Sequence, residues 1–201
     1  MVSFGLLTLS LVASVTCDSL SPDAAVRAVQ LSPVFAATLR AAQWSPDDSA
    51  RVLPWLTARA CRELSATRPR VLQGAAIVTF TAFFGIEDAS ALLGVRGRQV
   101  ILLNKIEGNR LVNELDLDAW NRFVDRLPPL PDSLIPEYVR FVAYAATGGG
   151  LLGPCVGGCD VIQVSADSMQ GRAFLYPLYR KLVTIGRDRR IIAIKTKAAP
   201  N

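Results

Sequence analysis

The chain of 201 residues contains no histidine. Because histidine is the commonest general base and a frequent metal ligand, its absence excludes Ser-His-Asp catalysis, Cys-His catalysis and histidine-type zinc sites within this chain. The sequence also lacks a Gly-x-Ser-x-Gly elbow, a Ser-x-x-Lys pair, a P-loop and a dinucleotide-binding glycine motif after a strand. We therefore expect no catalytic residue, no metal and no cofactor.

Charged residues are few and hydrophobic residues are many. Charged side chains make up 19% of the chain and hydrophobic ones 51%, with a mean hydropathy of +0.31. This balance excludes a disordered chain and lies at the apolar end of the range for soluble proteins. The length suits one globular domain, or one domain preceded by a processed leader.

The only long uncharged run near the N-terminus, Phe4 to Thr16, is too short to cross a bilayer, which takes about 20 residues. It fits the hydrophobic region of a secretory signal, and Cys17 follows directly. The tetrapeptide Ser14-Val15-Thr16-Cys17 resembles the lipobox of bacterial lipoproteins. That resemblance implies removal of residues 1–16, lipidation of Cys17 and anchoring to a membrane of the cell envelope. Ordinary signal cleavage, giving a secreted protein, and a buried N-terminal helix in a cytoplasmic protein are the alternatives.

Serine-proline pairs predict a helical N-terminal region over residues 17–70. Ser21, Ser32 and Ser45 each precede a proline, an arrangement typical of a helix N-cap followed by its first helical residue. The predicted helices span residues 22–30, 33–43 and 46–65, with Pro54 expected to kink the third.

After residue 70 the sequence changes to runs of apolar residues that include many β-branched and aromatic side chains. Residues 71–85 and 98–105 predict central strands, with a short helix or loop over 87–93 between them. The turn at 107–110 predicts a return strand over 111–115. Two helices, at 119–127 and 135–147, and an antiparallel meander at 160–165, 172–185 and 191–197 complete the prediction. The predicted fold class is α+β: N-terminal helices, then a mainly antiparallel sheet with two inserted helices, with regions 17–70 and 71–201 packed as a single globular domain.

Four cysteines stand at positions 17, 61, 155 and 159. The three residues between Cys155 and Cys159 include two glycines, which permits a small disulfide loop or a pair of plain thiols. A disulfide to Cys61 and a metal or redox role remain open as alternatives, although the spacing is one residue longer than the thioredoxin-like C-x-x-C.

Carboxylates provide the only candidates for catalysis. Asp116 and Asp118 have the D-x-D spacing of metal-dependent sugar-nucleotide transferases, but at the start of a helix an aspartate is the expected cap. Glu87 and Asp88 follow a predicted strand, where acids often act in chemistry. A carboxylate-dependent enzyme using these four residues is the alternative to a non-catalytic protein.

Positive charge is concentrated at the C-terminal end. Residues 171–201 carry eight basic residues and one acidic residue, a net charge of +7, whereas the other 170 residues carry 14 basic and 16 acidic residues. We expect a patch that binds an anionic lipid, polymer or protein surface, with a solvated hairpin as the alternative. No nucleic-acid motif is present, and no nucleic-acid partner is expected. The candidate patch residues are Arg187, Arg189, Arg190, Lys195 and Lys197.

These observations favour a membrane-anchored, extracytoplasmic, lipoprotein-like binding module without catalytic activity.

Overall fold

The computed structural model describes residues 16–42, 49–84, 87–146, 159–165, 167–175 and 179–198. The predicted leader over residues 1–16, the Ser45-Pro46 cap and the glycine segment at 148–158 therefore lie wholly or almost wholly outside the described residues. In chain order the elements are α1 (Ala24–Gln30), α2 (Pro33–Ala41), α3 (Ser49–Glu63), β1 (Ser65–Thr67), η2 (Arg70–Leu72), β2 (Ala76–Phe84), β3 (Glu87–Arg96), β4 (Gln99–Leu102), β5 (Asn104–Glu107), β6 (Arg110–Leu115), α4 (Leu117–Val124), η3 (Asp132–Leu134), α5 (Ile135–Ala145), β7 (Cys159–Val164), β8 (Ser168–Leu175), β9 (Tyr179–Gly186) and β10 (Ile191–Ala198).

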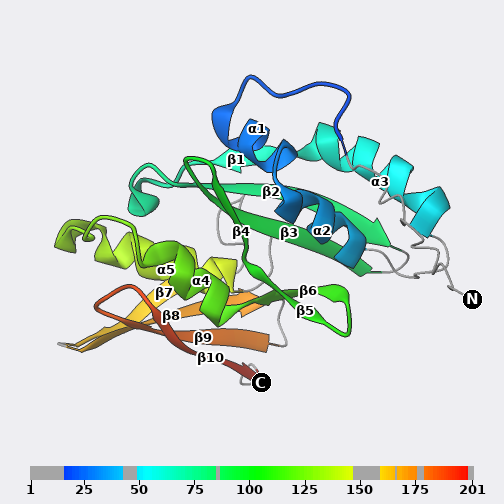
Figure 1. Cartoon of the computed structure of the whole chain (residues 1–201). Coiled ribbons are helices and arrows are strands. Elements are labelled where there is room, and N and C mark those ends of the chain that lie inside the picture. Colours follow the sequence, from blue (N-terminus) through cyan, green and yellow to red (C-terminus); the bar gives the residue numbers. More distant parts are fainter. Residues whose placement is uncertain are drawn as a thin grey trace, which may run out of the picture.

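The α+β prediction is confirmed, and the elements stack in alternating layers. The first sheet has the order β1-β2-β3-β4 and the second sheet has the order β10-β9-β8-β7, all antiparallel. Figure 1 shows α1, α2 and α3 over one side of the first sheet, and α4 and α5 between the two sheets. The second sheet forms the last layer, with no labelled helix on its far side.

Alternation along the strands of the first sheet gives two separate cores. Ala76, Val78 and Phe80 of β2 face α1, α2 and α3, where Phe80 meets Phe35 edge to face with ring centroids 5.6 Å apart. Ile77 of β2 faces the opposite way, into the core around α4 and α5. Because successive strand residues point to opposite faces, one buried strand serves both cores.

The central helices are buried by both sheets. Trp120 and Phe123 of α4, together with Tyr138 and Val139 of α5, are at most 2% exposed. The same core contains residues of the first sheet and inward-facing residues of the second, such as Val183. The apolar character of α5 around most of its circumference follows from this position.

Two glycines let the central helices approach the sheets closely. A Cβ at Gly94 of β3 would lie 2.7 Å from Phe123 Cδ2 of α4, and a Cβ at Gly171 of β8 would lie 2.6 Å from Val139 Cγ1 of α5. Neither distance is available to a real side chain, so a larger residue at either site would push a helix away from its sheet.

Several predicted boundaries agree with the structure. Ser32 and Asp116 act as N-caps, accepting hydrogen bonds from Val34 N (3.1 Å) and Ala119 N (2.9 Å), and this supports the capping role predicted for Asp116. The turn predicted at 107–110 joins β5 to β6, and Asn109 adopts a positive φ of 67°.

The prediction of a helix or loop over residues 87–93 is wrong. These residues form the first part of β3, which pairs with β2 from Glu87 opposite Phe84 to Val95 opposite Ala76. Alanine and leucine favour helices locally. Pairing with a long buried strand and covering both cores nevertheless stabilise this segment more than a helix would.

Three further predictions need correction. The strand predicted from residue 71 begins at Ala76, because Gln73 and Gly74 have positive φ and end the 3-10 turn before it. The strand predicted over 172–185 is a hairpin, β8 and β9. The strand predicted over 98–105 divides into β4 and β5, with Leu103 between them.

The helix start predicted at Ser21 also moves along the chain. Asp23 is the N-cap of α1, accepting hydrogen bonds from Ala25 N and Val26 N, while the Ser21 hydroxyl accepts one from Asp23 N. A carboxylate that can accept two backbone bonds caps the helix more effectively than the upstream hydroxyl.

We expect Gly171→Ala to lower the free energy of unfolding by about 1–3 kcal/mol, because the added methyl overpacks the contact with Val139. Chemical denaturation followed by circular dichroism measures this change. Gln170→Ala, on the opposite face of the same strand, is the control. An unchanged or increased stability of Gly171→Ala would contradict the close approach, since alanine is otherwise preferred to glycine in a strand.

Candidate functional site

Cys17 forms a disulfide with Cys61 of α3, with the two Cα atoms 5.7 Å apart. This bond ties the segment before α1 to the helical layer and closes a loop across 44 positions of sequence. Disulfides are typical of oxidising, extracytoplasmic compartments, which supports that part of the predicted location. None of the helices in the described ranges is long and apolar enough to span a bilayer.

The disulfide competes with the lipid anchor expected at Cys17. Lipidation of a lipoprotein cysteine uses its sulfur atom, and one sulfur cannot carry both a lipid thioether and a disulfide bond. In the structure the Cys17 sulfur is bonded to that of Cys61, a pairing that the sequence did not indicate for Cys17. Of the other predicted pair, Cys159 begins β7 and is disulfide-bonded, while Cys155 lies outside the described residues.

Only two of the four candidate carboxylates, Asp116 and Asp118, have side chains among the described residues. Asp116 caps α4 and Asp118 lies in the first turn of the same helix, where a negative charge favours the helix dipole. Glu87 and Asp88 begin β3, and their side chains lie outside the described residues. Among the described residues, no group of three or more acidic or cysteine side chains could hold a metal ion.

The turn between β9 and β10 separates the arginines of the predicted patch. Arg189 is only 4% exposed, has a positive φ of 71°, and donates from Nη2 to the carbonyl oxygen of Pro128 and, at 3.3 Å, to Gln73 Oε1. Its own carbonyl accepts a 2.8 Å hydrogen bond from the Tyr138 hydroxyl. Arg189 therefore holds the turn against the central helices, and little of it is exposed on the surface.

The other two arginines of this turn also bind within the protein. Arg190 makes two 2.7 Å hydrogen bonds to the carboxylate of Asp125, which holds the pKa of that carboxyl below its usual range. Arg187 donates from Nε to Ser165 O at 3.0 Å. The three arginines that are nearly adjacent in sequence thus stabilise three different contacts.

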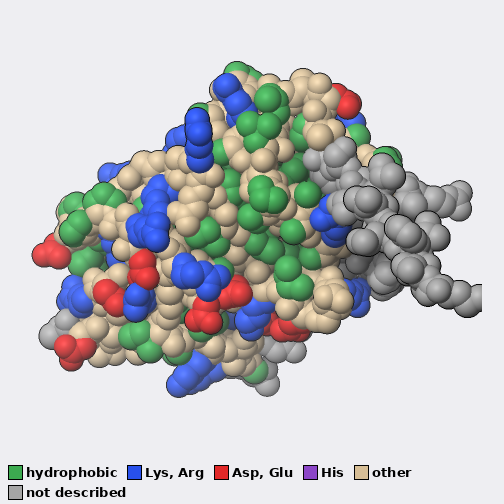
Figure 2. Space-filling view, viewed as in Figure 1, with side chains coloured by type: hydrophobic (Ala, Val, Ile, Leu, Met, Phe, Trp, Pro, Cys, Tyr) green, Lys and Arg blue, Asp and Glu red, His purple; other side chains and the backbone are tan. Residues whose placement is uncertain are grey.

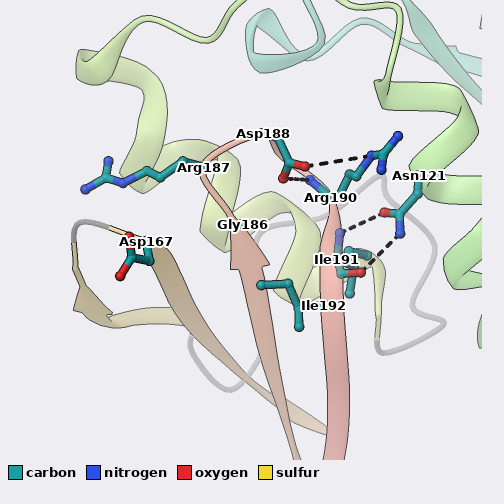
Figure 3. A pocket seen from close by; sticks show the side chains of 8 residues that line it. All are labelled: Asn121, Asp167, Gly186, Arg187, Asp188, Arg190, Ile191 and Ile192. Carbon is teal, nitrogen blue, oxygen red and sulfur yellow. Dashed lines mark hydrogen bonds and ion pairs between the residues drawn. The ribbon is translucent and has the colours of Figure 1, made fainter.

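A shallow depression of about 550 Å³ lies beside this turn (Figure 3). Asn121 donates to Ile191 O and accepts from Ile191 N, as a neighbouring strand would. Asp188 folds back over Gly186 and accepts from Arg190 N at 3.1 Å, and Figure 3 shows Arg187 pointing away from the depression. The polar groups at its centre are therefore satisfied by one another, and nothing there indicates a ligand.

The outer face of the second sheet has a different character. Val183 and Ile185 of β9 are fully buried against the central helices, so Arg180 and Leu182 face outward. By the same alternation, Lys195 and Lys197 of β10 and Arg172 of β8 lie on this outer face. We call these four cations, Arg172, Arg180, Lys195 and Lys197, the basic face.

The strand register sets like charges opposite each other on the basic face. Arg180 is directly opposite Lys197, and Lys195 is the next outward residue of β10, opposite Leu182. Directly opposed like charges destabilise a sheet. Asp160 neutralises Arg172 through a 2.7 Å ion pair, but no acidic side chain of the described residues pairs with Arg180, Lys195 or Lys197. By contrast, Figure 2 shows basic and acidic side chains interleaved over the lower half of the visible surface.

A second cluster lies on the inner side of the same end of the sheet. Lys105 Nζ of β5 lies 2.8 Å from Glu114 Oε2 of β6, and Lys181 Nζ of β9 lies 3.8 Å from Glu114 Oε1. The hydrogen bond from Lys105 is the main reason that the pKa of Glu114 is lowered, and the same bond raises the pKa of Lys105. Sequence reasoning missed this cluster, because its members are far apart along the chain.

Comparisons with protein-family models, with curated proteins and with solved structures find no match to this chain. The two lysines of the predicted patch on the basic face, Lys195 and Lys197, remain candidates for binding an anionic partner. The signal that could have added Arg180 is the alternation of β9, in which every second residue from Lys181 to Ile185 faces the core.

We expect replacement of both Cys17 and Cys61 by serine to lower the free energy of unfolding by about 2–4 kcal/mol, because the unfolded chain regains the entropy of an open loop. Thermal unfolding with and without reductant measures this loss. Reductant should destabilise the native protein more than the double variant, and equal responses would contradict the bond. Intact mass spectrometry of protein from its native host separates the alternatives, because a lipid mass on Cys17 would exclude the disulfide.

The ion pair of Glu114 predicts a contribution to stability at low pH. Because the folded-state pKa is lowered, the contribution is complete above the usual value of 4.5 and is lost as the pH falls through the folded-state pKa. Glu114→Gln should therefore weaken the dependence of unfolding free energy on pH in this acidic range. Asp132→Asn, which alters an exposed carboxylate of η3 with no salt bridge to the described residues, is the control. Equal slopes for native protein and Glu114→Gln would contradict the assignment.

Proposed function

We propose that the protein is an extracytoplasmic, non-catalytic binding module whose basic face binds the surface of a membrane containing anionic lipids. The observation that carries this proposal is the outer face of the second sheet, on which no helix of the described residues packs and where Arg180 is directly opposite Lys197, with Lys195 beside them. An anionic partner would relieve the repulsion between these cations. Such a partner would account for the opposed like charges, which a merely solvated face does not require.

The shape of the face favours a lipid surface over a small ligand. A sheet face offers an extended surface, and each basic side chain close to an anionic bilayer contributes about 1 kcal/mol. An apolar side chain is also exposed on the outer side of this sheet: Ile192 of β10 is 60% exposed, and its Cδ1 would lie 3.7 Å from a Cβ at the outward-facing Gly186. This side chain could enter the headgroup region while the cations contact phosphates.

The basic face makes an acyl anchor unnecessary for membrane contact. If Cys17 keeps its bond to Cys61, its sulfur cannot carry a lipid, and the basic face would still provide contact with the membrane. Lipidation of Cys17 stays a prediction that the mass measurement above tests. Of the four carboxylates nominated for an enzyme, Asp116 is used as a helix cap. The side chains of Glu87 and Asp88 lie outside the described residues, so the carboxylate-dependent enzyme stays an alternative prediction.

We expect a triple variant, Arg180→Ser, Lys195→Ser and Lys197→Ser, to bind phosphatidylglycerol vesicles about 100-fold more weakly than the native protein, since three contributions of about 1 kcal/mol are lost. Vesicle sedimentation measures the affinity, with phosphatidylcholine vesicles as the uncharged reference. The matched control removes three exposed arginines elsewhere, Arg98, Arg122 and Arg126, and should bind nearly as the native protein does.

Two results would overturn the proposal. Equal loss of binding in the two triple variants would mean that net charge alone attracts the protein. Tight binding to a soluble polyanion such as polyphosphate, with none to the anionic vesicles, would make the partner a polymer and exclude a lipid surface.

A further inference from the structure

A small cavity lies where the hairpin of β5 and β6 meets α4, the end of α5 and the second sheet. Its volume is about 140 Å³. The lining combines charged residues at one side with apolar walls. The residues that line it are Lys105, Glu114, Leu115, Leu117, Ala146, Lys181, Ile194 and Thr196.

Lys181 is the unusual member of this lining. Its side chain is only 12% exposed, and its ammonium lies 3.8 Å from the nearest carboxylate oxygen in the described residues, which is too long for a hydrogen bond. Lys105, at 2.8 Å, already donates to that carboxylate. One carboxylate therefore faces two ammonium groups, and the lysine whose side chain is more buried has the longer contact.

The Lys181 ammonium keeps some contact with water, but no side chain of the described residues lies within hydrogen-bonding distance of it. Lysine side chains commonly extend their ammonium group into solvent. Lys181 instead extends on the inner face of β9 toward Glu114. An anionic group in the cavity would supply a hydrogen-bond acceptor for this ammonium.

The remaining walls define the rest of the ligand. Apart from the hydroxyl of Thr196, the remaining walls offer no side-chain hydrogen bonds, so the portion of the ligand beyond its anionic head would be mainly apolar; these walls are Leu115, Leu117, Ala146 and Ile194. An apolar cavity of about 150 Å³ is known to hold a benzene molecule, which has six heavy atoms. A carboxylate with a chain of about four carbons has the same number of heavy atoms.

We propose that this cavity is a binding site for a short-chain carboxylate, whose head accepts a hydrogen bond from Lys181 and whose alkyl tail packs against Leu117 and Ile194. This site lies on the inner side of the second sheet and is independent of the basic face, which uses different residues of β9 and β10.

The test is a titration of the full chain with butyrate at neutral pH, followed by isothermal calorimetry and by NMR chemical-shift changes. We expect saturable binding to the native protein, weaker binding of acetate, which lacks the tail, and no binding of butanol, which lacks the charge. Lys181→Met should weaken butyrate binding at least about tenfold, as expected for loss of one charge-assisted hydrogen bond. Lys195→Met, which removes a lysine from the outer face of the same sheet, is the matched control and should bind butyrate normally.

A second variant keeps the test decisive if Lys181→Met fails to fold. Ala146→Leu fills the cavity without altering charge and should abolish butyrate binding while leaving vesicle binding intact. Absence of saturable butyrate binding to the native protein, or equal binding by native protein and folded Lys181→Met, would overturn the proposal. Inorganic phosphate binding as tightly as butyrate would also overturn it, because the site would then select charge without using its apolar walls.

Discussion

The structure depends on the burial of α4 and α5 between two sheets. A helix in this position must present apolar side chains in two directions, and α5 does so with Tyr138 and Val139 among its fully buried residues. Close packing then requires small residues on the sheets, which Gly94 and Gly171 supply. Polar groups that enter this layer must find partners inside it. The Tyr138 hydroxyl does so by bonding to the carbonyl of Arg189, and its burial raises the pKa of the phenol.

This central layer explains why the C-terminal positive charge divides into parts with different roles. The second sheet uses one face to cover the central helices, so its other face remains in contact with solvent. Arg189 and Arg190 form hydrogen bonds with residues that follow α4, whereas Lys195 and Lys197 lie on the outer face. The net charge of a sequence segment does not distinguish cations that form contacts within the protein from cations that stay exposed and could bind a partner.

The same division gives the two proposed sites their independence. Arg180 and Lys181 are neighbours in β9, but strand alternation sends one to the basic face and the other to the cavity beside Glu114. The Cys17–Cys61 disulfide lies in the helical layer on the other side of the first sheet. It stabilises the N-terminal helices without contacting either site.

Local signals in the chain are enough to predict the α+β class, the helix starts at Ser32 and Asp116 and the hairpin at Asn109, because caps and turns depend on a few neighbouring residues. The absence of histidine limits the available chemistry in any fold, since no arrangement of this chain can supply an imidazole. Contacts between distant segments, by contrast, make residues 87–93 a strand, join Cys17 to Cys61, and bring Lys105, Glu114 and Lys181 together. These features cannot be predicted from neighbouring residues, because a local preference of a few tenths of a kcal/mol per residue is readily outweighed by the burial of a strand between two layers.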